Sequence, residues 1–141
     1  MPKLTSLLNK LQQDYPELSF SSAKRYQFSP PTTIYFDASD PEPLLLLHEL
    51  GHYLLKQYDY SSDIELLRIE SAAWQQAKQL CTTYDVAWDE DFAEDRLDSY
   101  RNWLHANSLC PNCQISGYQD TNGLYHCPLC AKKWPGKYIP E

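Results

Sequence analysis

The stretch His48-Glu49-Leu50-Gly51-His52, which follows Pro43-Leu44-Leu45-Leu46-Leu47, decides how this chain folds. The leucine run predicts a buried helix, and proline is tolerated in the first turn of a helix. Residues four apart share a helical face, so His48 and His52 can both bind one Zn²⁺ ion. Glu49 then lies where its carboxylate can take a proton from a water on that ion. The pattern predicts a zinc site with Glu49 as general base; the alternative is a chance meeting of these side chains on a helix.

A catalytic zinc usually has three protein ligands and one open position, so a third ligand is needed. Three acids in the following segment compete for this place: Asp63, Glu65 and Glu70. A capping box that begins at Ser62 explains Glu65, and the helix dipole explains Asp63. The helical neighbours of Glu70 are apolar, so its carboxylate is costly to bury unless it is paired or bound to metal. We therefore predict Glu70 as the third ligand; an ion pair with Arg68 is the alternative.

A second metal site is predicted from two Cys-x2-Cys pairs, Cys110-Pro111-Asn112-Cys113 and Cys127-Pro128-Leu129-Cys130, with thirteen residues between them. Four thiolates at this spacing suit one tetrahedral zinc, and a closed four-cysteine site is structural because it has no open position. Thr121-Asn122-Gly123 is typical of a turn, so a hairpin is expected between the pairs. Two disulfides are the alternative, but no stretch at the N-terminus resembles a secretory signal. The fifth cysteine, Cys81, is expected to be a small buried hydrophobic residue.

The remaining elements are short. Leucines at helical spacing predict an N-terminal helix from Leu4 to about Asp14. Residues 23–28 and 32–37 read as two strands. Asp89 is expected to cap a third long helix that runs to about His105. The strand at 32–37 can either offer an exposed edge to an extended peptide or form a simple hairpin that covers the core.

These elements predict an α+β fold: a small antiparallel or mixed sheet with three or four helices, followed by a four-cysteine zinc-ribbon hairpin. With 141 residues, the chain has room for a main domain over 1–107 and a ribbon over 108–141. The net charge of −7 argues against general attraction to nucleic acid. No apolar run approaches the roughly 20 residues needed to span a bilayer, so no membrane partner is expected. The thiols and the lack of an export signal favour a cytoplasmic location.

His48, Glu49, His52, Glu70 and Trp74 together give a resemblance to the ImmA/IrrE family of zinc metallo-endopeptidases, over roughly residues 32–83. The resemblance implies a zincin-like, gluzincin-type core with the two histidines and Glu70 as zinc ligands and Glu49 as general base. Family members cleave transcriptional repressors. The ribbon is not a usual part of that family; it resembles that of the SprT-like proteases, which use a third histidine.

The predicted function is therefore hydrolysis of peptide bonds in an intracellular protein, such as a regulator, with one catalytic and one structural zinc. Two alternatives stay open: a non-catalytic two-zinc binding module, and a nucleic-acid-associated regulator that uses the ribbon. The oxyanion stabiliser has several candidates: Tyr53, Tyr58, Tyr60, Tyr100 and His105. The ribbon carries lysines beside aromatic residues, which can stack on bases or fill its own core, and we favour the core role: Lys132, Lys133, Lys137, Tyr118, Tyr125, Trp134 and Tyr138.

Overall fold

The protein has the expected α+β fold. A computed structural model describes residues 2–57 and 59–136, which contain four helices and two three-stranded sheets. The chain divides into two compact units. The first contains residues 1–58 and 72–88, and the second contains residues 59–71 and 89–141. None of the helices in the described residues combines the length and the apolar character needed to cross a membrane.

The sheet of the first unit has the order β1-β3-β2, with β1 (Ser19–Ser22) parallel and β2 (Gln27–Ser29) antiparallel to the central β3 (Thr33–Phe36). The sequence predicted β2 and β3 but not β1, which consists of three serines and one phenylalanine. Of the two alternatives left open for β3, the exposed edge is absent, because β1 pairs with one side of that strand and β2 with the other. The free edges of this sheet belong to β1 and β2.

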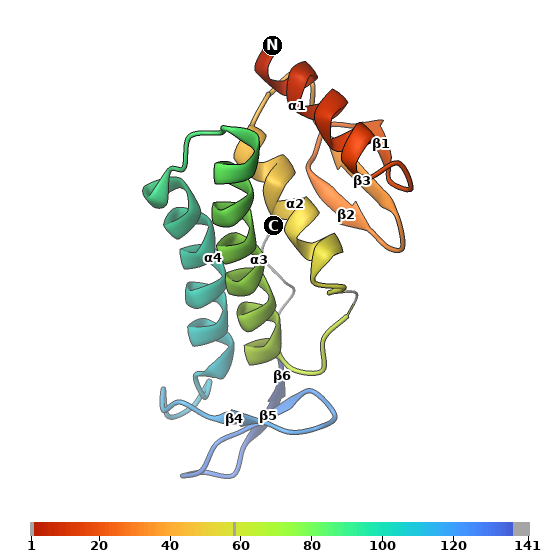
Figure 1. Ribbon diagram of the computed structural model, residues 1–141. Helices are drawn as coiled ribbons and strands as arrows, with labels where there is room; N and C mark the ends of the chain where they lie inside the picture. The colour runs from red at the N-terminus through yellow and green to blue at the C-terminus, as the bar shows by residue number, and fades with distance from the viewer. Residues whose placement is uncertain (1, 58, 137–141) are drawn as a thin grey trace. The chain divides into compact units, whose positions relative to one another are not determined.

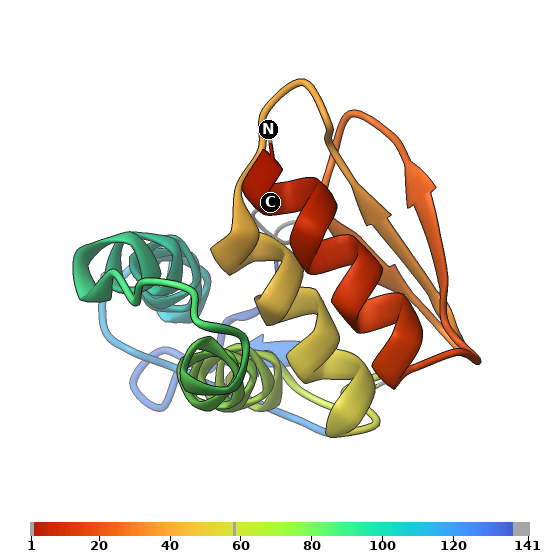
Figure 2. The ribbon, with the colours of Figure 1, turned by 45° about the horizontal axis from the view of Figure 1, so that its top comes forward.

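Two helices cover one face of this sheet. In Figures 1 and 2, α1 (Pro2–Asp14, red) and α2 (Pro43–Leu54, yellow) lie side by side against the orange strands. The predicted N-terminal helix is confirmed. Side chains of both helices and of β3 form a core that water does not reach, and its fully buried members are Leu11, Ile34, Leu46, Leu47 and Leu50. This core fixes α2, the helix that carries the two histidines.

The long helix α3 (Asp63–Tyr84) begins as predicted, because the backbone N–H of Glu65 donates to the Ser62 hydroxyl at 3.3 Å. Its later turns belong to the first unit. There it approaches α2 closely, since a Cβ on Gly51 would lie 2.8 Å from the carbonyl oxygen of Ala73. At the C-terminal end, the Tyr84 hydroxyl donates to Asp14 of α1 at 2.6 Å.

The second unit contains the first turns of α3, the helix α4 (Glu90–Ser108) and the ribbon. Asp89 caps α4 as predicted, accepting from the N–H of Phe92 at 3.1 Å. The ribbon strands β4 (Tyr118–Gln119), β5 (Leu124–His126) and β6 (Lys133–Pro135) form an antiparallel sheet. The expected hairpin is therefore present, with a third strand added.

Side-chain hydrogen bonds join the ribbon to the two helices of its own unit. The indole N–H of Trp134 donates to the carbonyl of Asn107 at 2.7 Å, and the Tyr125 hydroxyl donates to Asp63 at 2.5 Å. The boundary that the sequence placed after residue 107 lies within this unit. The ribbon thus packs as a continuation of α4 and of the start of α3.

Candidate metal centres

The first candidate centre lies on α2, where the two histidines occupy successive turns of one face. Their Nε2 atoms are 3.2 Å apart, and their rings meet edge to face with centroids 4.6 Å apart. His48 is 5% exposed and His52 is 8% exposed. The predicted convergence of these two side chains is therefore present in the structure, and both side chains are buried.

Glu49 lies beside the histidines and accepts a hydrogen bond from the sheet. Its Oε1 accepts a hydrogen bond of 2.7 Å from the backbone N–H of Phe28 in β2, and its Oε2 lies 3.8 Å from His48 Nε2. The Glu49 side chain is 13% exposed. The two carboxylate oxygens thus differ, because one is held by the backbone and the other faces the imidazole nitrogens. Phe28 was not identified from the sequence, since this contact depends on how the sheet packs on α2.

Trp74 of α3 forms the wall behind His48. The two rings stack with centroids 4.2 Å apart and planes inclined by 21°. Trp74 is 3% exposed and also contacts Trp88 edge to face at 6.2 Å. The stack restricts rotation of the His48 ring about its own axis. The sequence pointed to Trp74 as an apolar helical neighbour of Glu70 and through the family resemblance.

The turn after α2 brings Gln57 onto His52. His52 Nδ1 lies 2.8 Å from Gln57 Oε1. An amide oxygen only accepts hydrogen bonds, so this contact favours the tautomer that has the proton on Nδ1 and a lone pair on Nε2. Gln57 was not identified from the sequence, because it follows His52 by five positions, a spacing that does not indicate neighbours on one face of a helix.

These groups fit a divalent metal ion. The ligand atoms of His48, Glu49 and His52 all lie within 4.8 Å of one another. Imidazole nitrogens are donors that zinc takes in catalytic sites, and a carboxylate beside them, as Glu49 is here, suits a general base. The two Nε2 atoms are 3.2 Å apart, a distance at which they share a proton in a hydrogen bond or lie on either side of a cation. The donor chemistry therefore matches the metal predicted from the sequence.

Glu70, the predicted third ligand, lies on α3 and is 8% exposed. It belongs to the second unit, while His48 and His52 belong to the first. The alternative partner Arg68 is 74% exposed and lies 3.7 Å from Glu65. A buried carboxylate needs compensation, so the burial agrees with the argument made from the sequence. The role of Glu70 as a metal ligand stays a prediction.

The candidate oxyanion stabilisers remain unassigned. The Tyr53 hydroxyl donates to Glu17, and this hydrogen bond lowers the pKa of Glu17 from its ordinary value. Tyr60 is 39% exposed and belongs to the second unit. Tyr100 and His105 lie on α4. Tyr58 lies outside the described residues.

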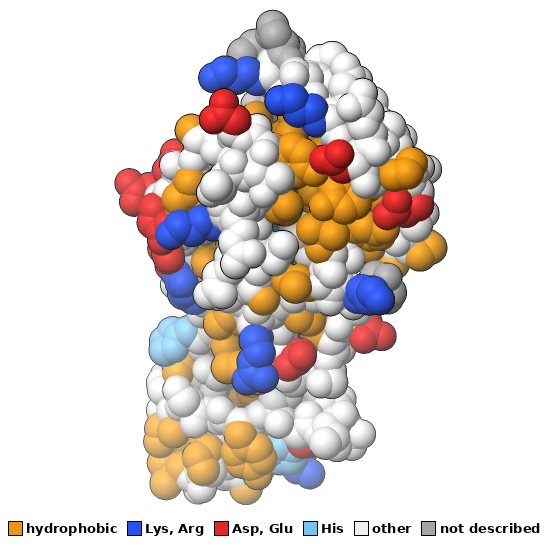
Figure 3. Space-filling view, viewed as in Figure 1, with side chains coloured by type: hydrophobic (Ala, Val, Ile, Leu, Met, Phe, Trp, Pro, Cys, Tyr) orange, Lys and Arg blue, Asp and Glu red, His pale blue; other side chains and the backbone are white. Residues whose placement is uncertain are grey.

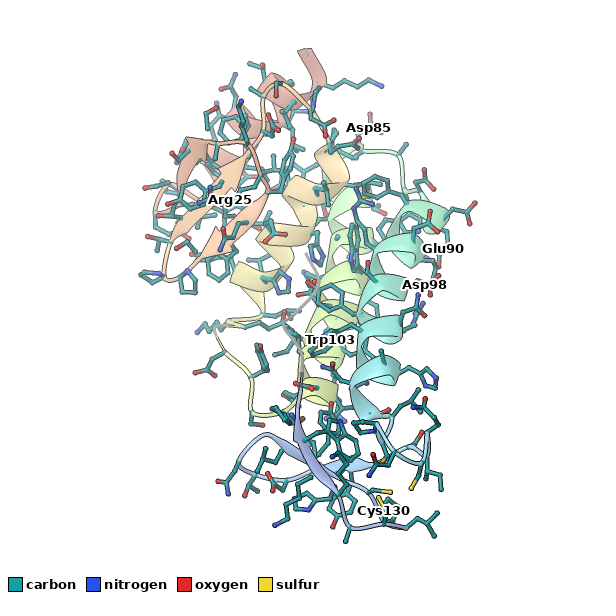
Figure 4. All side chains as sticks on the ribbon, turned by 180° about the vertical axis from the view of Figure 1, so that it is seen from behind. Arg25, Asp85, Glu90, Asp98, Trp103 and Cys130 are labelled. Atoms are coloured by element: carbon teal, nitrogen blue, oxygen red, sulfur yellow. The ribbon has the colours of Figure 1, made fainter. Side chains whose placement is uncertain are left out.

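The second candidate centre is the group of four ribbon cysteines. Their sulfur atoms lie within 4.8 Å of one another, and those of Cys110 and Cys130 are 3.6 Å apart. Figure 4 shows the sulfur atoms gathered at the labelled Cys130. All five cysteines of the chain are free thiols, and the fifth, Cys81, is buried in the first unit as expected. The predicted four-cysteine cluster is thus present and can hold a metal ion.

Backbone N–H groups favour the negatively charged thiolate form of one cysteine in this cluster. The N–H groups of Cys130 and Leu129 point at the Cys127 sulfur, each at 3.4 Å, and lower the pKa of that thiol to about 7. The hydrogen bond with Cys130 raises the pKa of Cys113 to about 12. One thiolate therefore forms readily, but a neighbouring thiol resists losing its proton beside it. A bound dication stabilises the neighbouring thiolates against their mutual repulsion, so that all four thiols lose their protons, as is usual in a tetrathiolate zinc site.

The ribbon aromatics divide between core and surface. Tyr125 and Trp134 pack with Cys110 and Cys127 in a small core, as predicted. Tyr118 is 59% exposed and stacks on His126. Figure 3 shows hydrophobic side chains on the surface of the ribbon, and the large exposed ones in this segment are Ile115, Tyr118 and Leu129. Lys137 and Tyr138 lie outside the described residues.

Comparison with protein-family models, with curated proteins and with solved structures found no match to this chain.

Proposed function

We propose that this protein is a zinc-dependent metallo-endopeptidase of the gluzincin-like type, similar to the ImmA/IrrE family. One observation carries the proposal: two buried histidines place their Nε2 atoms 3.2 Å apart, with the Glu49 carboxylate beside them. His48 and His52 would hold the ion, and Glu70 is the predicted third ligand. The ribbon cysteines would hold a second, structural zinc.

When bound, the zinc acidifies a water molecule and polarises the carbonyl of the scissile peptide bond. Glu49 takes the proton of the attacking water and later passes it to the leaving amine. Its Oε2 performs this transfer, because Oε1 is held by the Phe28 N–H. The Trp74 stack and the Gln57 hydrogen bond keep the two imidazoles in place. The buried setting strengthens each of these interactions relative to water.

A peptide substrate agrees with the position of Glu49 beside β2. The N–H of Phe28 that reaches Glu49 points away from β3, so the outer edge of β2 faces the candidate centre. An extended protein segment is the substrate shape that a strand edge accepts. We propose an intracellular protein as the physiological substrate.

The decisive experiment compares Glu49→Gln with the unaltered protein on a peptide library, with cleavage products identified by mass spectrometry. Loss of the general base should lower turnover by about 10²–10⁴-fold. Zinc content should stay at two ions per chain, because Glu49 is not a ligand. Equal cleavage by both proteins, or no cleavage by the unaltered zinc-loaded protein, contradicts the proposal.

The third ligand is tested separately. Glu70→Gln should weaken zinc at the histidine site and leave the ribbon zinc in place, since the four thiolates do not involve Glu70. Glu65→Gln is the matched control, because Glu65 lies on the same helix and pairs with the exposed Arg68. Zinc affinity is measured by competition with a chromophoric chelator. Unchanged affinity in Glu70→Gln would exclude this carboxylate from the ligand set.

A second candidate function is a non-catalytic binding module. The observation that favours it is the exposure of Leu129 (70%) and Tyr118 (59%) on the ribbon, since large exposed hydrophobics mark contact surfaces. Use of the ribbon aromatics to bind nucleic acid is less favoured, because Tyr125 and Trp134 lie in its core. The Glu49→Gln comparison separates the two functions, since a pure binding module has no turnover to lose.

A further inference from the structure

Gln57 contacts His52 twice, although it lies outside the helix that carries this histidine. Its side-chain Oε1 lies 2.8 Å from His52 Nδ1, and its backbone N–H donates to the His52 carbonyl at 3.0 Å. The backbone contact belongs to the turn that ends α2. There Lys56 has φ of 55°, and its N–H donates to the carbonyl of Tyr53. This is the Schellman arrangement, which folds the chain back over the last turn of a helix.

The turn determines where the Gln57 side chain goes. Because the chain reverses at Lys56, residue 57 returns to the face of α2 that His52 occupies instead of continuing away from it. Gln57 is half-buried there, so water competes poorly for the Nδ1 proton. The amide oxygen accepts this proton, and the tautomer of His52 with a lone pair on Nε2 is favoured.

The tautomer matters because only a bare ring nitrogen binds a metal. His52 Nε2 is the atom that faces His48 Nε2. A histidine held in the opposite tautomer would turn a proton toward the metal position and would have to exchange it before binding. Hydrogen-bond partners of this kind typically change metal affinity by about 10–100-fold.

We propose that Gln57 is a positioning residue of the histidine metal site: it sets the tautomer and the ring orientation of His52 before the metal binds. This inference rests on the proposed zinc site at His48 and His52. It adds to that site a group that is not a ligand and that the HExxH pattern does not contain. The residue acts through His52 and does not itself touch the metal or a substrate.

The test compares Gln57→Leu with Gln57→Glu. Leucine has a similar size but accepts no hydrogen bond, whereas the glutamate carboxylate still accepts one. Gln79→Leu, on an exposed position of α3, is the control for the same chemical change elsewhere. Because each variant keeps the residue 57 N–H, the turn that ends α2 is preserved. Zinc affinity is measured by chelator competition on the whole chain, and the ribbon zinc serves as the internal reference.

Gln57→Leu should weaken zinc at the histidine site by about 10–100-fold, while Gln57→Glu and Gln79→Leu stay within about threefold of the unaltered protein. In the zinc-free protein, ¹⁵N chemical shifts should report a proton on His52 Nδ1, and Gln57→Leu should shift this proton toward Nε2. A purely structural role would change thermal stability without moving the tautomer.

An affinity and a tautomer that both stay unchanged in Gln57→Leu would overturn the inference. Its failure is distinct from failure of the peptidase proposal. If Gln57→Leu loosens zinc but the unaltered protein cleaves no peptide, the positioning role stands and the peptidase does not. If the protein cleaves peptides and Gln57→Leu binds zinc normally, the reverse holds.

Discussion

At the scale of single residues, Gly51 shows why one position inside His48–His52 has no side chain. An added Cβ would lie 2.8 Å from the Ala73 carbonyl oxygen and 3.4 Å from Gln76 Cβ. Backbone atoms cannot give way as the end of a flexible side chain can. The absence of a Cβ therefore lets α2 and the later turns of α3 approach closely, which places Trp74 against His48.

Gly51→Ala should destabilise the protein by about 1–3 kcal/mol, because the helices must move apart to accept the methyl group. This loss should exceed the gain of about 1 kcal/mol that alanine brings to a helix interior. Urea denaturation measures the change, and zinc affinity at the histidine site should fall with it. A more stable Gly51→Ala variant would contradict the close approach.

Tyr84 provides a prediction with a pH dependence. Burial and the hydrogen bond to Asp14 raise the pKa of Tyr84 above its ordinary value. The folded state therefore keeps the proton at a pH where the unfolded chain loses it, so stability is full below about pH 10 and falls as pH rises further. Tyr84→Phe should cost about 1–2 kcal/mol at pH 7. The difference between the two proteins should shrink above pH 10 in urea denaturation, and a constant difference would argue against the raised pKa.

At the scale of elements, the end of α2 depends on a residue that is poorly suited to its conformation. Lys56 has φ of 55°, where a Cβ is disfavoured and glycine is not. Lys56→Gly should therefore stabilise the protein by about 0.5–1 kcal/mol, because the Schellman turn is kept and its strain is removed. Thermal unfolding measures the gain. Lys78→Gly, in the interior of α3, is the opposite control and should destabilise.

The helices were predictable and the sheet was less so. Apolar periodicity and the caps at Ser62 and Asp89 are local signals, and the structure has the helices where these signals lie. The β1 strand is serine-rich and has no such signal; it forms because β3 offers it a partner. Strand order depends on packing between distant segments, and a pattern of single residues does not encode it.

The same distinction applies to the candidate centres. His48, His52 and the four cysteines follow from spacing, because side chains four positions apart on a helix, or three positions apart around a knuckle, are brought together by local geometry. The supporting groups do not follow from spacing. Phe28 reaches Glu49 across 21 positions, and Gln57 reaches His52 only because Lys56 turns the chain.

At the scale of the whole molecule, the two units should respond differently to metal removal. The ribbon core is small, consisting of Cys110, Tyr125, Cys127 and Trp134, so we expect it to depend on a metal for its stability. The first unit has a larger leucine core. A strong chelator should therefore accelerate hydrogen exchange over residues 109–136 while α2 stays protected.

Matched variants sharpen this test. Cys113→Ser should reproduce the effect of the chelator on the ribbon and remove one zinc per chain. Cys81→Ala should leave the zinc content unchanged, because Cys81 is buried away from the cluster in the first unit. Mass spectrometry reads both the exchange and the metal content. A ribbon that stays protected after complete demetallation would contradict a structural role for its metal.

The hydrogen bond from Phe28 to Glu49 affects which variant is suitable for testing the proposed role of this carboxylate. The Glu49 side chain accepts from the Phe28 N–H at the outer edge of β2, a donor that would otherwise be free to pair with another molecule. Glutamine keeps an oxygen to meet that donor, whereas alanine leaves it bare and invites self-association. If the Glu49→Ala variant aggregates, its behaviour reflects both the exposed backbone N–H and the missing carboxylate. The Glu49→Gln variant removes only the carboxylate and therefore separates the two effects.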